Sequence, residues 1–166
     1  MIVYLIGMSG VGKTTIGKKL SQQLNYQFLD LDKVIELSSH LSITEIFNQF
    51  GENHFRKLEQ EELLKTFALN NYIIATGGGT PCFFDNMKLM KQNGKTIYLQ
   101  LNPSTIFNRF EYQEIAKRPL LKKEKEFIEL FESRKNFYNQ ADIKLDVNID
   151  DYLNILIKQI KLISTS

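Results

Sequence analysis

The stretch "GMSGVGKTT" at residues 7–15 decides the fold of this chain. It fits the spacing G-x-x-x-x-G-K-[ST], which is filled by Gly7, Gly12, Lys13 and Thr14. An apolar run, "IVYLI", precedes the stretch, and a segment with helical spacing follows it. In this arrangement the N–H groups of the loop turn toward phosphate oxygens, and the helix adds the positive end of its dipole. The stretch therefore predicts a strand, loop and helix that bind a nucleoside triphosphate, with Lys13 on the β- and γ-phosphates and Thr14 on Mg²⁺.

Short apolar runs bounded by turn residues continue along the chain and predict five strands, at 2–6, 26–31, 72–76, 96–101 and 142–147. Residues with helical spacing lie between and after them: Ile16, Leu20 and Leu24; Met87, Leu89 and Met90; and Tyr152, Leu153, Leu156, Ile157, Ile160 and Ile163. Such alternation is typical of an α/β protein whose parallel sheet is covered on both faces. Repeats and low-complexity linkers are absent, which favours a single domain over residues 1–166.

The composition excludes several classes of protein. The 166 residues are 43% hydrophobic and 24% charged, and a formal charge of +2 gives no basic stripe for nucleic acid. A single cysteine, Cys82, fits a cytoplasmic protein without disulfides. The apolar start is too short for a signal or membrane segment, and Lys158 and Lys161 fit the solvated face of a final helix. We therefore expect neither nucleic acid nor a membrane as a partner.

The second predicted strand ends in "FLDLD" at residues 28–32. With a period of two, Phe28, Asp30 and Asp32 would share one face. Two carboxylates so close together need a nearby Mg²⁺ or a ligand hydroxyl to offset their repulsion. The alternative is a solvated strand end at which Asp32 caps a helix starting at Lys33.

Arginines form a second group of candidates. Arg56 in "GENHFRKLE" has Glu59 at i+3, a spacing that can hold a guanidinium. Arg134 falls within an apolar helical stripe of Phe127, Leu130, Phe131 and Tyr138. An inward arginine needs an anionic partner, which is either a structural carboxylate or the carboxylate of a substrate.

A third arginine, Arg118, precedes Pro119 in a charged loop that runs from Glu111 to Lys123. Such a loop resembles a lid over bound nucleotide, where one arginine steadies the phosphate in transfer. The alternative is an ordinary surface loop. His40 and His54 lack the spacing of a zinc site, and Cys82 has no partner histidine in view.

Three consecutive glycines, 77–79, follow the third predicted strand in "YIIATGGGTP". They are either a tolerated turn or backbone left bare so that a ligand can lie against it. Ligands of open α/β sheets bind beyond the carboxyl ends of the strands. The glycines are predicted to lie at the same sheet edge as the phosphate loop and "FLDLD", which favours the second explanation.

Taken together, these segments resemble the shikimate kinases. The motifs "GMSGVGKTT", "FLDLD", "GENHFRKLE", "TGGGTP", "RPLL" and "ESRKNFY" stand in the order and spacing of that family, over about residues 1–147. The resemblance implies a P-loop NTPase of the nucleoside-monophosphate-kinase type. Its five-stranded parallel sheet has the order 2-3-1-4-5 and is flanked by helices, with a mobile lid at about 111–123 and an acceptor-binding segment at about 31–62. A monomer is the expected state.

The resemblance also implies roles for individual residues. ATP would be bound by Gly10, Val11, Gly12, Lys13, Thr14, Thr15, Arg109 and Arg118, and Mg²⁺ by Thr14 and Asp30. Shikimate would be held by Asp32, Arg56, Gly77, Gly78, Gly79 and Arg134. Lys13, Asp32 and Arg118 are the expected catalytic residues, and we hypothesise that Asp32 orients or deprotonates the 3-hydroxyl that attacks ATP. A kinase of another small acceptor and a non-catalytic nucleotide-binding module are the alternatives.

Overall fold

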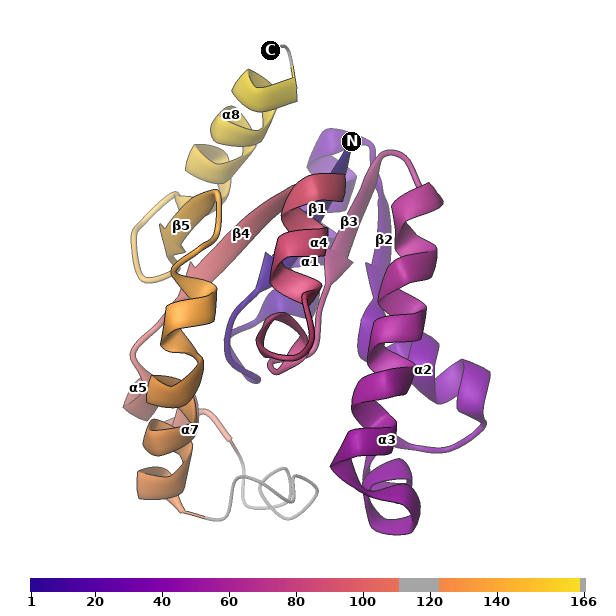
Figure 1. Ribbon diagram of the computed structural model, residues 1–166. Helices are drawn as coiled ribbons and strands as arrows, with labels where there is room; N and C mark the ends of the chain where they lie inside the picture. Colours follow the sequence, from indigo (N-terminus) through magenta and orange to yellow (C-terminus); the bar gives the residue numbers. More distant parts are fainter. Residues whose placement is uncertain (111–122, 165–166) are drawn as a thin grey trace.

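The computed structural model describes residues 1–110 and 123–164 (Figure 1). Its longer elements are β1 (Ile2–Ile6), α1 (Lys13–Leu24), β2 (Gln27–Asp30), α2 (Leu31–Ser39), α3 (Ile43–Lys65), β3 (Tyr72–Ala75), α4 (Asn86–Asn93), β4 (Lys95–Gln100), α5 (Pro103–Asn108), α7 (Glu124–Tyr138), β5 (Ile143–Asp146) and α8 (Tyr152–Ser164). Two short 3₁₀ turns, η1 (Thr66–Ala68) and η2 (Thr80–Cys82), flank β3.

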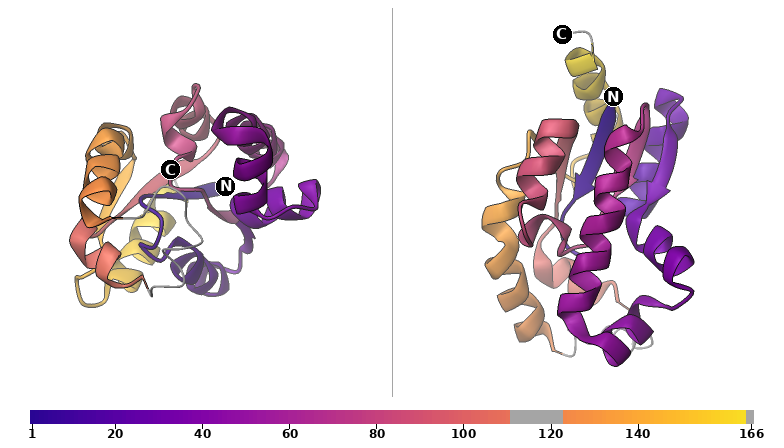
Figure 2. Two further views of the ribbon diagram at one scale, coloured as in Figure 1. Left: turned by 90° about the horizontal axis from the view of Figure 1, so that it is seen from below. Right: turned by 45° about the vertical axis from the view of Figure 1, so that its right-hand side comes forward.

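The five strands form one parallel sheet in the order β2-β3-β1-β4-β5. Each predicted strand is present with ends that differ by one residue at most, and the predicted strand order is confirmed. Helices α1 and α8 lie on one face of the sheet, and α3, α4 and α7 lie on the other (Figures 1 and 2). This is the two-sided arrangement that near-continuous apolar strands require, because both faces of the sheet are removed from water.

The buried residues explain why the helices settle on the sheet. All five residues of β1 are buried between two neighbouring strands and two helical layers. In α1, Ile16 and Leu20 point into the core, and in α7 the predicted stripe buries Phe127, Phe131 and Tyr138. The predicted amphipathic helices are confirmed. No helix within residues 1–110 and 123–164 is long and apolar enough to cross a membrane.

The register of the sheet brings three chain segments to one edge. Leu5 of β1 pairs with Ala75 of β3, and Ala75 pairs with Asp30 of β2. Because these strands run in parallel and end at the same level, the segments that leave them must begin side by side. The loop 7–12, the start of α2 and the glycines 77–79 are therefore neighbours.

The prediction that "FLDLD" up to Asp32 forms the end of the second strand was wrong. The strand stops at Asp30, and Leu31 already begins α2. The carboxylate of Asp30, rather than that of Asp32, caps this helix by accepting from the Lys33 N–H at 3.4 Å. Since Asp32 lies in the first helical turn, the two-residue alternation does not place it on the face of Asp30.

Helix α3 is two helices joined by a kink. Gly51 has φ +79° and ψ 173°, a backbone conformation that interrupts the helical ladder. A capping box of Ser42 and Glu45 starts the first half. The second half, from Glu52 onward, carries Arg56 and Glu59 toward the sheet edge.

Asp142, just before β5, ties this edge strand to β4. Its carboxylate accepts from the N–H and the hydroxyl of Thr96 at 2.9 and 2.8 Å, and Lys91 lies 3.5 Å away. Burial alone would raise the pKa of Asp142, but the bonds from Thr96 and the charge of Lys91 outweigh burial and lower it. The ionised form is thus favoured by folding, and its contribution to stability is present above the unfolded-state pKa of about 3.9.

We expect Asp142→Asn to lower the free energy of unfolding at pH 7 by about 1.5 kcal/mol, since hydrogen bonds to a charged acceptor are replaced by neutral ones. The difference from wild type should shrink as the pH falls through the lowered pKa, because the wild-type carboxylate is then protonated. Urea unfolding at pH 7 and at about pH 3 measures it. The exposed Asp85, changed to Asn, is the control. An equal difference at both pH values would contradict this role.

Candidate active site

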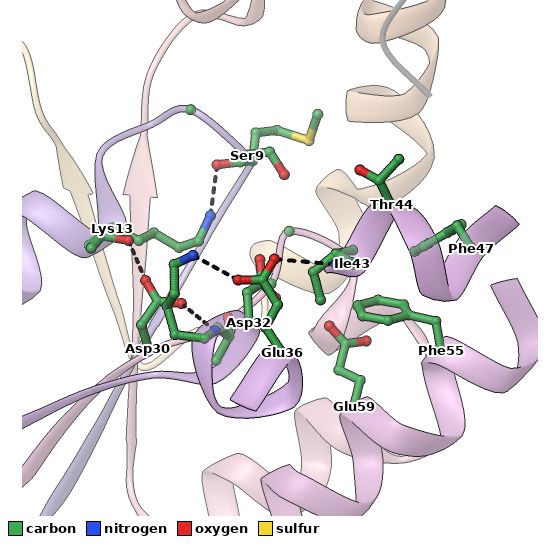
Figure 3. Close-up of a pocket in the computed structure, with 18 of the residues that line it drawn as sticks. Ser9, Lys13, Asp30, Asp32, Glu36, Ile43, Thr44, Phe47, Phe55 and Glu59 are labelled. Carbon is green, nitrogen blue, oxygen red and sulfur yellow. Dashed lines mark hydrogen bonds and ion pairs between the residues drawn. The ribbon is translucent and has the colours of Figure 1, made fainter. Parts of the chain in front are cut away.

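A cavity of about 1110 Å³ opens at this edge of the sheet. Its walls come from the loop after β1 and the start of α1, from the end of β2, from α2 and α3, from the glycines after β3, from the end of α5 and from the middle of α7. Figure 3 shows Asp30, Asp32 and Glu36 facing Thr44, Phe47 and Glu59 across part of it. The predicted site residues that line it are Gly10, Gly12, Lys13, Thr14, Thr15, Asp30, Asp32, Arg56, Gly77, Gly78, Gly79, Arg109 and Arg134.

One described residue of the prediction, Val11, is not part of this lining. The Val11 side chain is 2% exposed and packs in the core, so only its backbone is suited to a ligand. Arg118, with most of the predicted lid, lies outside the described residues. Arg109 is exposed at the end of α5, on the side of the cavity formed by that helix.

The loop 7–12 has the geometry expected of a phosphate cradle. Gly10 and Gly12 have φ +86° and +103°, values that L side chains rarely adopt, and they let the loop fold tightly before α1. Lys13 is the first residue of α1, and its ammonium donates to the carbonyls of Gly7 and Met8 at 2.7 and 2.8 Å. A cation is therefore fixed beside the N-terminus of a helix. An anion bound there is stabilised both by the charge of Lys13 and by the positive end of the helix dipole.

Thr14 and Asp30 form the candidate metal site. The Thr14 hydroxyl donates to Oδ2 of Asp30 at 2.6 Å, so two oxygen donors lie together beside the phosphate loop. Mg²⁺ prefers oxygen ligands and takes few of them from a protein when phosphate and water supply the rest. Within the described ranges no group of three or more His, Cys, Asp or Glu side chains is arranged to hold a metal. The Thr14–Asp30 pair fits a Mg²⁺ ion shared with nucleotide.

Arg56 is held rigidly by its surroundings. Its Nε and Nη2 donate to Glu52 at 3.1 and 2.8 Å, and its Nη1 donates to Glu59 at 2.8 Å. The rings of Phe83 and Phe55 lie 4.2 and 5.0 Å from the guanidinium carbon. Burial alone would lower the pKa of Arg56, but the two glutamates outweigh burial and raise it. Among the described residues three of its five N–H donors are engaged, which leaves two that could be offered to a ligand.

Arg134 is only 7% exposed and faces the same cavity from α7. No acidic side chain forms an ion pair with it in residues 1–110 and 123–164. A buried cation without an anion is costly, and a ligand carboxylate would offset that cost. The described residues supply no structural carboxylate to Arg134, and pairing with a ligand carboxylate stays a prediction.

The glycines 77–79 are needed for space rather than for flexibility. A Cβ on Gly79 would lie 2.6 Å from both Nη atoms of Arg56, and one on Gly78 would lie 2.8 Å from Oγ of Ser9. A Cβ on Gly77 would lie 2.5 Å from Oε1 of Glu59 and 2.9 Å from Oδ1 of Asp32. The bare backbone therefore contacts the phosphate loop, the arginine and both carboxylates at once.

Several residues that the sequence did not single out complete the site. The Tyr138 hydroxyl donates to the Gly78 carbonyl at 2.6 Å and lies 3.3 Å from the Met8 sulfur. Burial raises the pKa of this phenol, although Arg134 opposes the shift, so the group stays a donor. Glu52 had a readable signal, the i,i+4 spacing to Arg56. Phe83 had none, because only the tertiary fold brings it to the arginine.

Cys82 lies close to the two arginines without taking part in these bonds. Burial raises the pKa of its thiol to about 11, while Arg134 and Arg56 partly offset that effect. The thiol remains protonated at neutral pH and is a poor nucleophile. A protonated thiol fits the sequence, in which Cys82 has no partner histidine in view.

Known proteins share both the sequence and the structure. The family model for shikimate kinase matches residues 9–162. A shikimate kinase of Persephonella marina is 42% identical over 144 residues, which cover 86% of this chain and 87% of that protein. The crystal structure of shikimate kinase from Bacteroides thetaiotaomicron has a TM-score of 0.85 at 33% identity and covers 100% of this chain and 99% of that one.

A second solved structure, shikimate kinase from Acinetobacter baumannii in complex with shikimate, has a TM-score of 0.88 at 30% identity. It covers 99% of this chain and 93% of that one. The order of six sequence motifs, the sheet topology and these matches all agree. The chain belongs to the shikimate kinase family.

Proposed function

We propose that this protein transfers the γ-phosphate of ATP to the 3-hydroxyl of shikimate, which yields shikimate 3-phosphate and ADP. The observation that carries the proposal is the pair of buried arginines, Arg56 and Arg134, beside a phosphate loop. Shikimate combines a carboxylate with ring hydroxyls, so it matches a cavity with cations at one side and Asp32 at another. The reaction belongs to the biosynthesis of chorismate and the aromatic amino acids.

The acceptor is bound by groups that approach it from different elements. The proposed roles of Arg56 and Arg134 are to pair with its carboxylate, and the bare backbone of 77–79 lets its ring lie close. Asp32, at the start of α2, accepts a hydrogen bond from the 3-hydroxyl. This contact orients the nucleophile and provides a site for its proton.

The nucleotide is bound at the loop 7–12, with Gly10, Val11, Gly12 and Thr15 offering backbone or hydroxyl donors. Lys13 offsets charge on the phosphates, and Thr14 and Asp30 would hold Mg²⁺. When bound, this ion neutralises charge on the β- and γ-phosphates.

Two further arginines are assigned to the nucleotide. Arg109 is proposed to lie near the adenine and Arg118 to contact the phosphates from the lid. We propose a monomer in the cytoplasm that acts without nucleic acid or a membrane.

A coupled ADP-release assay with a panel of acceptors tests this function. Shikimate should support ADP release, whereas gluconate and nucleoside monophosphates should not, because neither combines the carboxylate and hydroxyl spacing that the site requires. Quinate, which shares the carboxylate, tests how strictly the ring is selected. ADP release with a nucleotide acceptor and none with shikimate would overturn the proposal.

Gly78→Ala is expected to raise the KM for shikimate by about tenfold or more, with the fold retained, since misplacement by a fraction of an ångström at a binding wall is costly. Its Cβ would crowd Oγ and the backbone nitrogen of Ser9 at 2.8 and 3.0 Å and would contact Nη1 of Arg134, beside the proposed position of the acceptor. Steady-state kinetics measure the effect, and the melting temperature controls for stability. An unchanged KM for shikimate would contradict contact between this residue and the acceptor.

A further inference from the structure

Thr80 follows the three glycines and is fully buried in η2. Its hydroxyl donates to Oε1 of Glu59 at 2.6 Å, and Glu59 is also fully buried. A buried carboxylate is tolerated only where donors satisfy its oxygens. The other oxygen of this carboxylate, Oε2, accepts from Nη1 of Arg56 at 2.8 Å.

Thr80 is itself fixed by its backbone. Its N–H donates to the carbonyl of Gly77 at 3.2 Å. Its carbonyl accepts from Nδ2 of Asn86 at 3.0 Å, and Asn86 is fully buried at the start of α4. The backbone that carries the hydroxyl is therefore tied to the segment after β3 and to the start of α4.

The guanidinium of Arg56 is closely surrounded, so that its position can change very little. The backbone of Gly79 approaches so closely that a Cβ there would lie 2.6 Å from both Nη atoms. The Phe83 ring stacks 4.2 Å from its central carbon. A rotation of the Glu59 carboxylate would carry Nη1 with it and change the direction of the N–H groups that remain for a ligand.

We propose that Thr80 is a positioning residue for the acceptor carboxylate, acting through Glu59 on Arg56. This inference rests on the proposed function, in which Arg56 binds the carboxylate of shikimate. Thr80 touches neither the acceptor nor the nucleotide in this scheme. Its loss should weaken acceptor binding equally in the ground and transition states, so KM changes and kcat does not.

The test compares variants of Thr80 that differ in the donor alone. Thr80→Val preserves the shape but removes the hydroxyl, and it should raise the KM for shikimate about tenfold, because a small displacement of a binding group is costly. The KM for ATP and kcat should stay within about twofold. Thr80→Ser keeps the donor and should restore the KM for shikimate. If Thr80→Val does not fold, Thr80→Ala replaces it.

Thr66→Val is the matched control. Thr66 is 3% exposed, its hydroxyl donates to the Leu63 carbonyl at 2.6 Å and lies 3.0 Å from the Tyr4 hydroxyl, and it is not part of the cavity wall. This change should lower the melting temperature without changing the KM for shikimate. An equal rise in KM in both valine variants would show a general loss of stability and would overturn the inference.

A double-mutant cycle locates the path of the effect. Calorimetry should show that Thr80→Val weakens shikimate binding much less in an Arg56→Lys background than in the wild type. A full effect in that background, or an unchanged KM in Thr80→Val, would overturn the inference. These outcomes are distinct from failure of the proposed function, which would appear as a wild-type protein that releases no ADP with shikimate.

Discussion

Asp32→Asn is expected to lower kcat by about 10²- to 10⁴-fold, the range associated with a positioned acid or base. The change keeps the size of the side chain but removes its charge and its ability to take a proton. The affinity for ATP should be retained, because the phosphate loop and Lys13 are untouched. Single-turnover kinetics with saturating shikimate measure the chemical step, and equilibrium binding measures ATP.

Asp85→Asn is the control for this change of charge, since Asp85 is exposed and its side chain makes no capping bond. It should turn over like the wild type. The fold decrease in kcat of Asp32→Asn is expected to exceed any fold increase in its KM for shikimate. The reason is that the proposed hydrogen bond to the 3-hydroxyl is strongest in the transition state, when that oxygen attacks. Near-normal turnover in Asp32→Asn would remove this residue from the reaction.

Lys13→Ala should lower kcat by about 10²- to 10³-fold, the cost of losing one preorganised charge at the site where negative charge develops. The ammonium is held by the carbonyls of Gly7 and Met8, so it is already in place when phosphate arrives. Since α1 begins at Lys13 and alanine favours a helix, the helix should persist. Steady-state rates and circular dichroism together measure the loss and the fold.

Lys19→Ala on the exposed side of α1 is the matched control, because it removes the same group from the same helix. It should leave kcat within about twofold of wild type, the small effect typical of surface substitutions. If Lys13→Ala retained the wild-type kcat, the loop 7–12 would not serve as the phosphate cradle.

The inner strands β1, β3 and β4 were predictable because they are largely buried on both faces and are therefore near-continuous apolar runs. The edge strands β2 and β5 are only partly buried, and the turn residues that bound them made them recognisable. The position of the site followed from the parallel sheet, since parallel strands release their loops at one edge. Arg56 and Glu59 were predictable as a pair because helical spacing alone places them together. These inferences depend on local patterns or on general rules of topology.

The end of β2 was not predictable in the same way. Asp30 and Asp32 are both suitable N-caps, and the local sequence does not say which of them begins α2. Asp30 pairs with Ala75, which is the last residue of β3, so β2 has no partner beyond this point. That limit is set by a tertiary contact and not by the local sequence. The partners Thr80, Phe83 and Tyr138 were missed for the same reason, because β3 and α7 bring them to the site from distant parts of the chain.

The two carboxylate oxygens of Asp30 perform different tasks. One accepts from the Lys33 N–H and starts α2, and the other accepts from the Thr14 hydroxyl beside the phosphate loop. An alanine at this position would therefore remove the helix cap and the proposed Mg²⁺ ligand in one step, and the two effects could not be told apart. Asparagine is as good a helix cap as aspartate but carries no charge. Asp30→Asn therefore keeps the helix cap and removes the negative charge, so it measures the contribution of the charge alone.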